Sequence, residues 1–139
     1  MAFNIRAMPP EAPELKPLED IVADDGRYPM DAFLFVQEGL SRTVQQLQRA
    51  AEEDPARRHV SGAELACGLR DFAVDRWGFL AGTVLRSWNL RTTRDFGEIV
   101  FLLVDNGYLQ KTEGDAVEDF DDVFCFTDFD KGYRIKANA

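Results

Sequence analysis

Apolar side chains recur at helical spacing along most of the chain. In residues 30–51, apolar positions follow one another at intervals of three and four: Phe33, Val36, Leu40, Val44, Leu47 and Ala51. Because an α-helix returns to the same face about every 3.6 residues, this spacing predicts a long amphipathic helix. Gly39 lies inside that helix, where glycine costs about 1 kcal/mol relative to alanine. We therefore expect another helix to cross close to Gly39.

The densest apolar run, residues 99–104, lies within the stretch 95–111 and has charged residues on both sides. Such a run could be a buried strand, but its flanks favour a helix. Thr92 or Thr93 can cap the helix, and Asp95 places a carboxylate in the first turn, where free backbone amides stabilise it. Asn106-Gly107 suits the end of a helix. A helix that is apolar nearly all round is buried, so we predict a central core helix with Ile99 beside an inner stripe of Phe96, Val100 and Leu103.

Three further segments carry shorter helical patterns. Residues 18–25 form a candidate helix that Gly26 stops. Ser61 and Glu64 have the spacing of a capping box, so a helix should begin there and end at Trp77-Gly78. Its inner stripe consists of Leu65, Leu69, Phe72 and Ala73. Residues 79–88 make the next helix, with these side chains pointing inward: Leu80, Val84 and Trp88.

The pattern changes after Gly107. Residues 108–111 and 123–126 suit two short strands, and the polar, acidic residues 112–122 would join them as a hairpin. The predicted fold class is therefore mainly α (α+β), a compact, winged-helix-like bundle of about five helices with a small C-terminal β-hairpin. Residues 1–17 carry four prolines and predict an extended arm. Residues 18–130 form the single domain, and residues 131–139 a polar tail.

The composition narrows the functional classes. The chain has 139 residues, and 45% of them are hydrophobic, which is enough for one domain with a core. The net charge of −9 argues against a general affinity for nucleic acid or for an anionic membrane. No apolar stretch is long enough to span a membrane, and the N-terminus lacks a signal-peptide pattern. The two cysteines, Cys67 and Cys125, form no CxxC motif, so we expect a cytoplasmic protein in which both are small buried hydrophobic residues.

The most unusual surface feature is the acidic segment 113–130, which holds eight acidic residues and no lysine or arginine. It could bind a divalent ion through oxygen ligands, although no EF-hand register fits. It could instead dock a basic partner, or form a solvated loop. Phenylalanines interleave with the acids at positions 120, 124, 126 and 129, which favours docking unless they form a hairpin core. The candidate partner-binding residues are Glu113, Asp115, Glu118, Asp119, Phe120, Asp121 and Asp122.

The only histidine, His59, follows Arg57 and Arg58 just before the predicted capped helix. These three residues could bind an anion at that helix N-terminus, or they form a solvated basic link. A single histidine without a nucleophile motif is more often structural than catalytic. The sequence contains no P-loop, dinucleotide-binding fingerprint, GxSxG motif, HExxH motif or zinc-spaced cluster. We therefore assign no catalytic residue, no cofactor and no metal ligand.

Three short stretches form a specific combination: Arg27-Tyr28-Pro29-Met30-Asp31-Ala32-Phe33, His59-Val60-Ser61-Gly62 and Asp95-Phe96-Gly97-Glu98-Ile99-Val100-Phe101. Together they resemble a family of small, uncharacterised proteins restricted to planctomycetes and verrucomicrobia. The resemblance covers roughly residues 18–127. It implies a soluble bacterial protein and brings no activity, ligand or catalytic residue.

A looser resemblance links the second half of the chain to the end of a winged-helix domain. It rests on a helix followed by Asn-Gly-Tyr-Leu-Gln-Lys, an acidic loop and Val-Phe-Cys-Phe. In such a domain, residues 79–88 and 94–105 would be the helix-turn-helix pair and residues 108–126 the wing. The sequence departs from a DNA-binding version because the second helix is too apolar to read base edges, and an acidic wing is repelled by phosphate. The resemblance therefore implies a shape without an affinity for DNA.

These features predict a non-enzymatic protein–protein interaction or scaffold module that uses the acidic, phenylalanine-containing segment. The expected partner is a protein of basic character, and a homodimer is left open. One alternative is a winged-helix regulator that binds nucleic acid through Arg42, Arg49, Arg57, Arg58, Arg86, Arg91 and Arg94. The other alternative is a divalent-metal-binding or acid–base enzyme.

Overall fold

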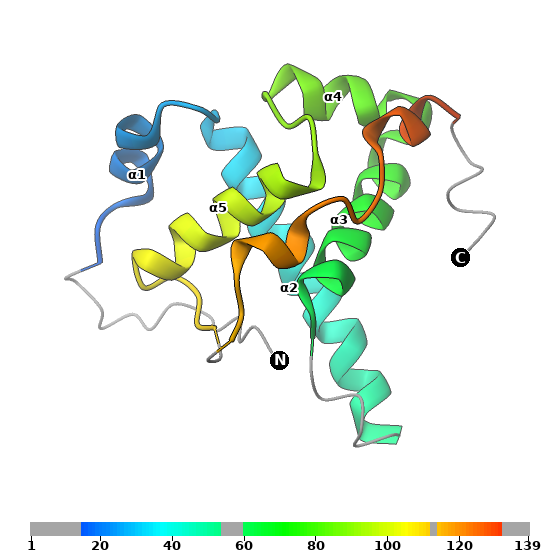
Figure 1. Cartoon of the computed structure of the whole chain (residues 1–139), viewed down its shortest axis with the longest axis horizontal. Coiled ribbons are helices and arrows are strands. Elements are labelled where there is room, and N and C mark those ends of the chain that lie inside the picture. Colours follow the sequence, from blue (N-terminus) through cyan, green and yellow to red (C-terminus); the bar gives the residue numbers. More distant parts are fainter. Residues whose placement is uncertain (1–14, 54–59, 112–113, 132–139) are drawn as a thin grey trace.

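The computed structural model describes residues 15–53, 60–111 and 114–131, which are mainly helical, as predicted (Figure 1). Four α-helices in this part of the chain have eight residues or more: α1 (Leu18–Asp25), α2 (Met30–Glu53), α3 (Gly62–Trp77) and α5 (Thr93–Asp105). A fifth, α4 (Ala81–Ser87), has only seven residues. The short 3₁₀ segments are η2 (Gly78–Leu80), η3 (Val117–Phe120) and η4 (Phe126–Lys131). The described residues thus hold four longer helices, where the sequence predicted about five.

The helix ends follow the capping residues. Gly26 ends α1 in the left-handed conformation, with a φ of 74°. At the start of α3 the Ser61 Oγ accepts a hydrogen bond from the backbone N–H of Glu64 at 3.0 Å. The Glu64 carboxylate accepts one in return from the backbone N–H of Ser61 at 3.1 Å. This capping box confirms the predicted start of α3.

Helices α2 and α3 cross closely at two glycines. A Cβ atom added to Gly39 would lie 2.5 Å from Cδ2 of Leu69, and one added to Gly68 would lie 2.0 Å from Oγ1 of Thr43. Both contacts are far shorter than two side chains allow, so each helix contributes a bare backbone where the other places a side chain. The close crossing predicted from Gly39 is confirmed.

Helix α5 forms the centre of the core. Its residues Phe96, Ile99, Val100 and Leu103 are fully buried, as predicted. An aromatic cluster joins α5 to the neighbouring helices, because the ring of Phe35 lies within 6.4 Å of the rings of Phe72, Trp77, Trp88 and Phe96, measured between centroids. Each fully buried large apolar side chain contributes roughly 1.5–3 kcal/mol.

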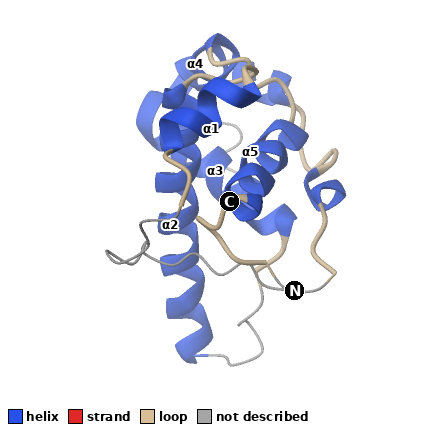
Figure 2. Ribbon diagram, turned by 90° about the vertical axis from the view of Figure 1, so that its left-hand side faces the viewer, coloured by secondary structure: helices blue, strands red, loops and turns tan. Residues whose placement is uncertain are grey.

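The predicted C-terminal β-hairpin is wrong. Figure 2 shows helices and loops, and the described residues contain no strand, including those at 108–111 and 123–126. Residues 115–131, here called the strap, instead run across α5 and α3 towards α4 (Figure 1). They pack there through η3 and η4 rather than pairing with residues 108–111.

Three helix glycines bring the strap onto the core. A Cβ atom at Gly97 would lie 2.8 Å from the ring of Phe120, and one at Gly62 would lie 2.8 Å from Cβ of Asp119. A Cβ atom at Gly82 would lie 2.9 Å from Cβ of Phe129. Because these backbones carry no side chain, the strap lies against α3, α4 and α5 at close range.

The predicted helix at residues 79–88 is also altered. It begins as the 3₁₀ turn η2, whose first residue, Gly78, has a φ of 50°. The turn changes the register, so that Ala81, Gly82 and Leu85 are buried. Leu80, which was predicted to point inward, is exposed.

Candidate functional site

The predicted acidic surface is largely committed to the fold. Glu113 lies outside the described residues. Asp115 and Phe120 are buried, and the carboxylate of Asp119 accepts a hydrogen bond from the backbone N–H of Ala116 at 3.0 Å. The exposed members are Glu118, Asp121 and Asp122. Three of the six candidate residues that the structure describes are therefore open to solvent.

Asp121 and Asp122 are neighbours with different surroundings. Asp121 accepts hydrogen bonds from Nη1 of Arg94 at 3.1 and 3.2 Å, and Arg94 also contacts Glu98 at 3.4 Å. The hydrogen bonds to Asp121 and then Glu98 raise the pKa of Arg94. Asp122 instead sits at a φ of 52°, in the left-handed region that aspartate visits more readily than most residues.

The phenylalanines of the strap face the core, which weighs against the predicted docking surface. Phe120, Phe126 and Phe129 are buried, and Phe124 is half-buried. The rings of Phe124 and Phe126 stack with centroids 5.7 Å apart and planes 10° apart. The ring of Phe129 meets that of Phe126 edge-on at 5.3 Å. These aromatic side chains hold the strap in place.

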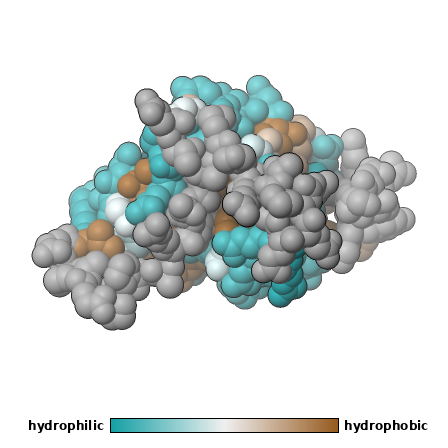
Figure 3. All heavy atoms as spheres, turned by 90° about the horizontal axis from the view of Figure 1, so that it is seen from below, coloured by the Kyte–Doolittle hydropathy of each residue, from teal (hydrophilic) through white to brown (hydrophobic). Residues whose placement is uncertain are grey.

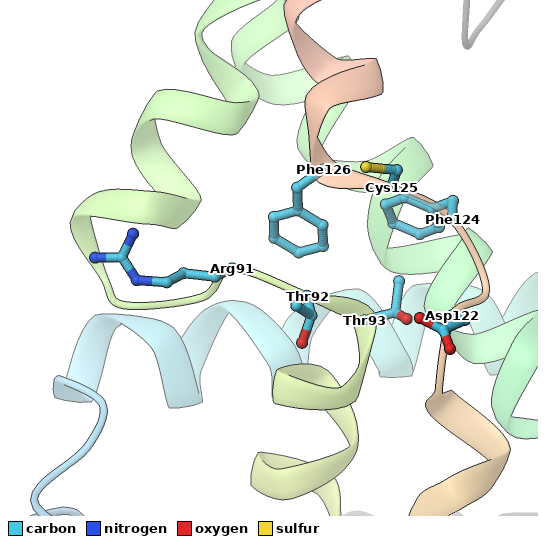
Figure 4. Close-up of a pocket in the computed structure, with 7 residues that line it drawn as sticks. All are labelled: Arg91, Thr92, Thr93, Asp122, Phe124, Cys125 and Phe126. Atoms are coloured by element: carbon cyan, nitrogen blue, oxygen red, sulfur yellow. The ribbon is translucent and has the colours of Figure 1, made fainter.

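A cavity of about 250 Å³ opens between the strap and the loop that precedes α5 (Figure 4). Residues 91–93 form one wall, and Asp122 with residues 124–126 forms the other. Figure 4 shows the Phe126 ring between the loop and Phe124, while the guanidinium of Arg91 extends away from the rings. Cys125, predicted to be buried, is exposed, with its Sγ 3.0 Å from Oγ1 of Thr127.

Thr93 fixes the base of this cavity. Its hydroxyl donates to the backbone carbonyl of Phe120 at 2.5 Å and accepts from the backbone N–H of Val123 at 3.2 Å. Thr93 is itself buried. One side chain of α5 therefore satisfies two backbone groups of the strap. The sequence suggested Thr93 only as a possible helix cap, and that role belongs to Thr92.

The loop before α5 is tied to the start of α2 by a second polar contact. The hydroxyl of Tyr28 donates to Oδ1 of Asp95 at 2.5 Å. Oδ2 of Asp95 accepts from the backbone N–H groups of Arg91 at 2.8 Å and Thr92 at 3.0 Å. Burial first, and then the hydrogen bond to Asp95, raise the pKa of Tyr28 well above its usual value. No sequence pattern pointed to this pairing of distant residues.

A different surface stands out by its exposed apolar side chains. Among the described large hydrophobic residues, Phe79 is 67% exposed, Leu80 62% and Leu34 49%. Phe79 and Leu80 are adjacent in η2, at the corner between α3 and α4; we call this pair the apolar corner. Figure 3 shows another face, seen from below, on which hydrophobic residues form small separate areas within a hydrophilic surface.

The end of α3 that leads into the apolar corner packs against α2. Phe35 contacts the ring of Trp77 with centroids 5.5 Å apart, and Glu38 forms an ion pair with Arg76 at 3.1 Å. These contacts place the first turns of α2 alongside the end of α3, from which η2 continues. In the sequence, Phe79-Leu80 directly follows a glycine that ends a helix. This pattern predicts the start of another buried helix, so it did not indicate an exposed pair.

The other predicted sites are not assembled in the part of the chain that the structure describes. Arg57, Arg58 and His59 lie outside the described residues. The described part of the chain holds no group of three or more potential metal-binding side chains. Of the arginines proposed for nucleic acid, Arg94 pairs with Asp121, and Arg42 lies 4.9 Å from the centre of the Phe72 ring. Both arginines therefore already contact side chains of the protein itself.

None of the helices in residues 15–53, 60–111 and 114–131 combines the length and the apolar character needed to cross a membrane.

The family resemblance and the winged-helix resemblance stay predictions. Compared with known proteins, the chain matches no protein-family model, no curated protein and no solved structure.

Proposed function

We propose that the protein is a non-enzymatic protein–protein interaction module and that its partner binds the apolar corner. One observation carries this proposal: Phe79 and Leu80 are adjacent large apolar residues, and both are more than half exposed. Single exposed apolar residues are ordinary on protein surfaces, but adjoining ones are typical of interaction sites. Covering both would remove substantial apolar area from water, at about 25 cal/mol for each Å² buried.

The support beneath the corner favours this role. The rings of Trp77 and Trp88 meet edge-on with centroids 5.5 Å apart, and Phe35 packs against both. Phe79 and Leu80 thus come soon after Trp77 in the chain, and Trp77 belongs to a packed aromatic cluster. A surface whose backbone is already ordered loses little conformational entropy on binding, which strengthens association.

The acidic segment is the weaker candidate for the same function. Its phenylalanines are directed into the core, and Asp121 is engaged by Arg94. Exposed ion pairs and single surface carboxylates contribute little binding energy, typically below about 1 kcal/mol. The apolar corner therefore replaces the acidic segment as the proposed contact surface.

Site-specific crosslinking tests the proposal. Phe79 is replaced by the photo-reactive residue p-benzoylphenylalanine in cells that make the protein, and Thr83, an exposed residue of α4, is replaced in a matched control. We expect a discrete crosslinked partner from position 79 and none from position 83. The purified partner then gives a dissociation constant for each variant.

We expect the double change Phe79→Ser with Leu80→Ser to weaken that binding at least tenfold, because truncated hot-spot residues commonly cost more than about 1 kcal/mol each. The single change Glu118→Lys, on the acidic segment, should leave binding within about twofold, since surface charge contributes little. Equal crosslinking from both positions would contradict the proposal. So would a double variant that binds as well as the wild type.

A further inference from the structure

We propose that the cavity between residues 91–93 and the strap binds a compact organic cation, an alkylammonium or guanidinium group. This site lies apart from the apolar corner and does not depend on the proposed function. Neither the sequence patterns nor the predicted partner surface pointed to a cavity here. Its shape, its aromatic walls and its charge each support the assignment.

The volume and the walls suit a small group with apolar character. About 250 Å³ is enough for a short alkyl chain with a charged head. Phe124 and Phe126 supply aromatic surface, since both line the cavity and their rings stack with planes 10° apart. The faces of such rings carry partial negative charge and attract cations within about 6 Å.

The charge that faces the cavity is negative. Asp122 is exposed at one end of it, beside Thr93 (Figure 4). Its neighbour Asp121 is neutralised by Arg94, but no cation in the described residues pairs with Asp122. The left-handed φ of 52° at Asp122 sets the course of the chain here and separates the surroundings of the two carboxylates.

The single cationic residue of the wall does not occupy the cavity. Nε of Arg91 donates to Oδ1 of Asn89 at 3.2 Å, and Figure 4 shows its guanidinium directed away from the rings. Asn89 is held in turn, because its Nδ2 donates to the backbone carbonyl of Arg27 at 3.1 Å. Arg70 does not line the cavity, but its guanidinium carbon lies 5.7 Å from the centre of the Phe124 ring, so one ring of the wall already attracts a cation of the protein itself. The cavity therefore keeps the Phe126 ring and the carboxylate of Asp122 for an incoming cation.

Other ligand classes fit the cavity less well. An anion would meet the carboxylate of Asp122, and the hydroxyl of Thr93 already donates to the carbonyl of Phe120. A divalent metal ion prefers six or more oxygen ligands, and the cavity presents one carboxylate. A purely apolar ligand would leave Asp122 facing it without compensation. An organic cation satisfies the rings and the carboxylate together.

The matched test is an NMR titration of the ¹⁵N-labelled full chain with n-butylammonium chloride, with sodium chloride at equal ionic strength as the reference. We expect progressive shifts of the backbone amides of residues 91–93 and 122–126 that sodium chloride does not produce. The change Asp122→Asn should weaken binding at least fivefold. Asparagine also adopts the left-handed conformation readily, so the backbone should be kept.

The control variant is Glu118→Gln, which removes one negative charge from an exposed position outside the cavity. We expect it to bind n-butylammonium as the wild type does. A second variant, Phe124→Leu, keeps apolar volume but removes a ring, and it should weaken binding by at least twofold. Equal weakening by Asp122→Asn and Glu118→Gln would show general attraction to an acidic protein and overturn the site. Cavity amides that do not respond would overturn it as well.

The same titration separates two sources of the cation. A free small molecule predicts that n-butylammonium binds at least as tightly as the lysine side chain of a Gly-Gly-Lys-Gly-Gly peptide. A basic side chain of a partner protein predicts that the peptide binds more tightly, with the same dependence on Asp122. Peptide binding that ignores Asp122→Asn would contradict the cation site.

Discussion

The ring of Phe120 lies against the bare backbone of Gly97, so close that a Cβ atom on residue 97 would sit 2.8 Å from the ring. This contact seats η3 on the central helix. The Gly97→Ala change should force the buried ring aside, an overpacking cost of typically about 1–3 kcal/mol. Alanine returns about 1 kcal/mol through its better helix propensity. We expect a net loss of up to about 2 kcal/mol in the free energy of unfolding, measured by urea denaturation.

The control for this prediction is a double-mutant cycle with Phe120→Leu. Leucine is smaller and more flexible than phenylalanine, so the added methyl group of Gly97→Ala should cost less in the Phe120→Leu background. A cost that is the same in both backgrounds would mean that residues 97 and 120 do not interact.

Tyr28 and Asp95 predict a loss of stability at high pH. Because the folded protein raises the pKa of Tyr28 above its unfolded value of about 10, the neutral phenol stabilises the fold. That contribution is complete below about pH 10 and is lost as the pH rises above it towards the pKa of the folded protein. The free energy of unfolding of the wild type should therefore fall between about pH 10 and pH 12.

The Tyr28→Phe variant isolates this effect. It removes the hydrogen bond to Asp95, so at pH 7 it should be less stable by about 1.5–3 kcal/mol, the range for bonds to charged groups. It should also lose less stability between about pH 10 and pH 12, since residue 28 no longer ionises. The control is Tyr108→Phe, which removes a hydroxyl bonded to the carbonyl of Lys16 at 2.6 Å and leaves Tyr28 in place. This variant should still show the loss of stability at high pH that Tyr28 causes. Parallel pH profiles for the wild type and Tyr28→Phe would contradict the assignment.

Thr93 predicts a local effect on the strap. The Thr93→Val change keeps the shape of the side chain but removes the hydroxyl that pairs with the Phe120 carbonyl and the Val123 N–H. Leaving buried polar groups unpaired costs about 1–3 kcal/mol. We expect faster hydrogen exchange of the Val123 amide and a lower free energy of unfolding. Thr83→Val, at an exposed position of α4, should change neither quantity.

The helical part of the fold could be predicted because its signals are local. The start of α3 at Ser61 and Glu64, and the end of α1 at Gly26, depend on residues within one turn of each other. The inner stripe of α5 follows from the period of the helix. Each of these features is written in a short window of sequence, so it survives without knowledge of the tertiary structure.

The strap could not be predicted in the same way, because its contacts join distant residues. Gly39 correctly indicated a close crossing, and Gly62, Gly82 and Gly97 carry the same signal. Their partner is an irregular segment with alternating acids and phenylalanines, whose pattern resembles a strand when its neighbours are unknown. The acidic residues predicted a surface segment, whereas the buried phenylalanine rings determine where the segment lies.

The candidate sites show the same limit. The cavity joins the loop before α5 to Asp122, about thirty positions later, and only the fold brings them together. The apolar corner depends on a single 3₁₀ turn that begins at Gly78 and exposes Leu80, which a continuous helix was predicted to bury. The helical period alone does not indicate where such a turn interrupts a helix.

The tightest helix crossing gives the last prediction. A Cβ atom at Gly68 would lie 2.0 Å from Oγ1 of Thr43 and 2.5 Å from its Cγ2, and both residues belong to packed helices. The hydroxyl of Thr43 also donates to the carbonyl of Gly39 at 2.8 Å, so the side chain cannot rotate away without losing that bond. Overpacking at this site should cost about 2–3 kcal/mol, the upper end of the usual range, and alanine returns about 1 kcal/mol through its helix propensity. We therefore expect Gly68→Ala to lower the free energy of unfolding by about 1–2 kcal/mol. Thr43→Ala removes the two nearest of these atoms and leaves only Cβ, which would lie 2.8 Å from the added methyl carbon. The Gly68→Ala, Thr43→Ala double variant should therefore be more stable than Gly68→Ala alone, measured by urea denaturation. A double variant less stable than Gly68→Ala would show that the helices do not cross at these two residues.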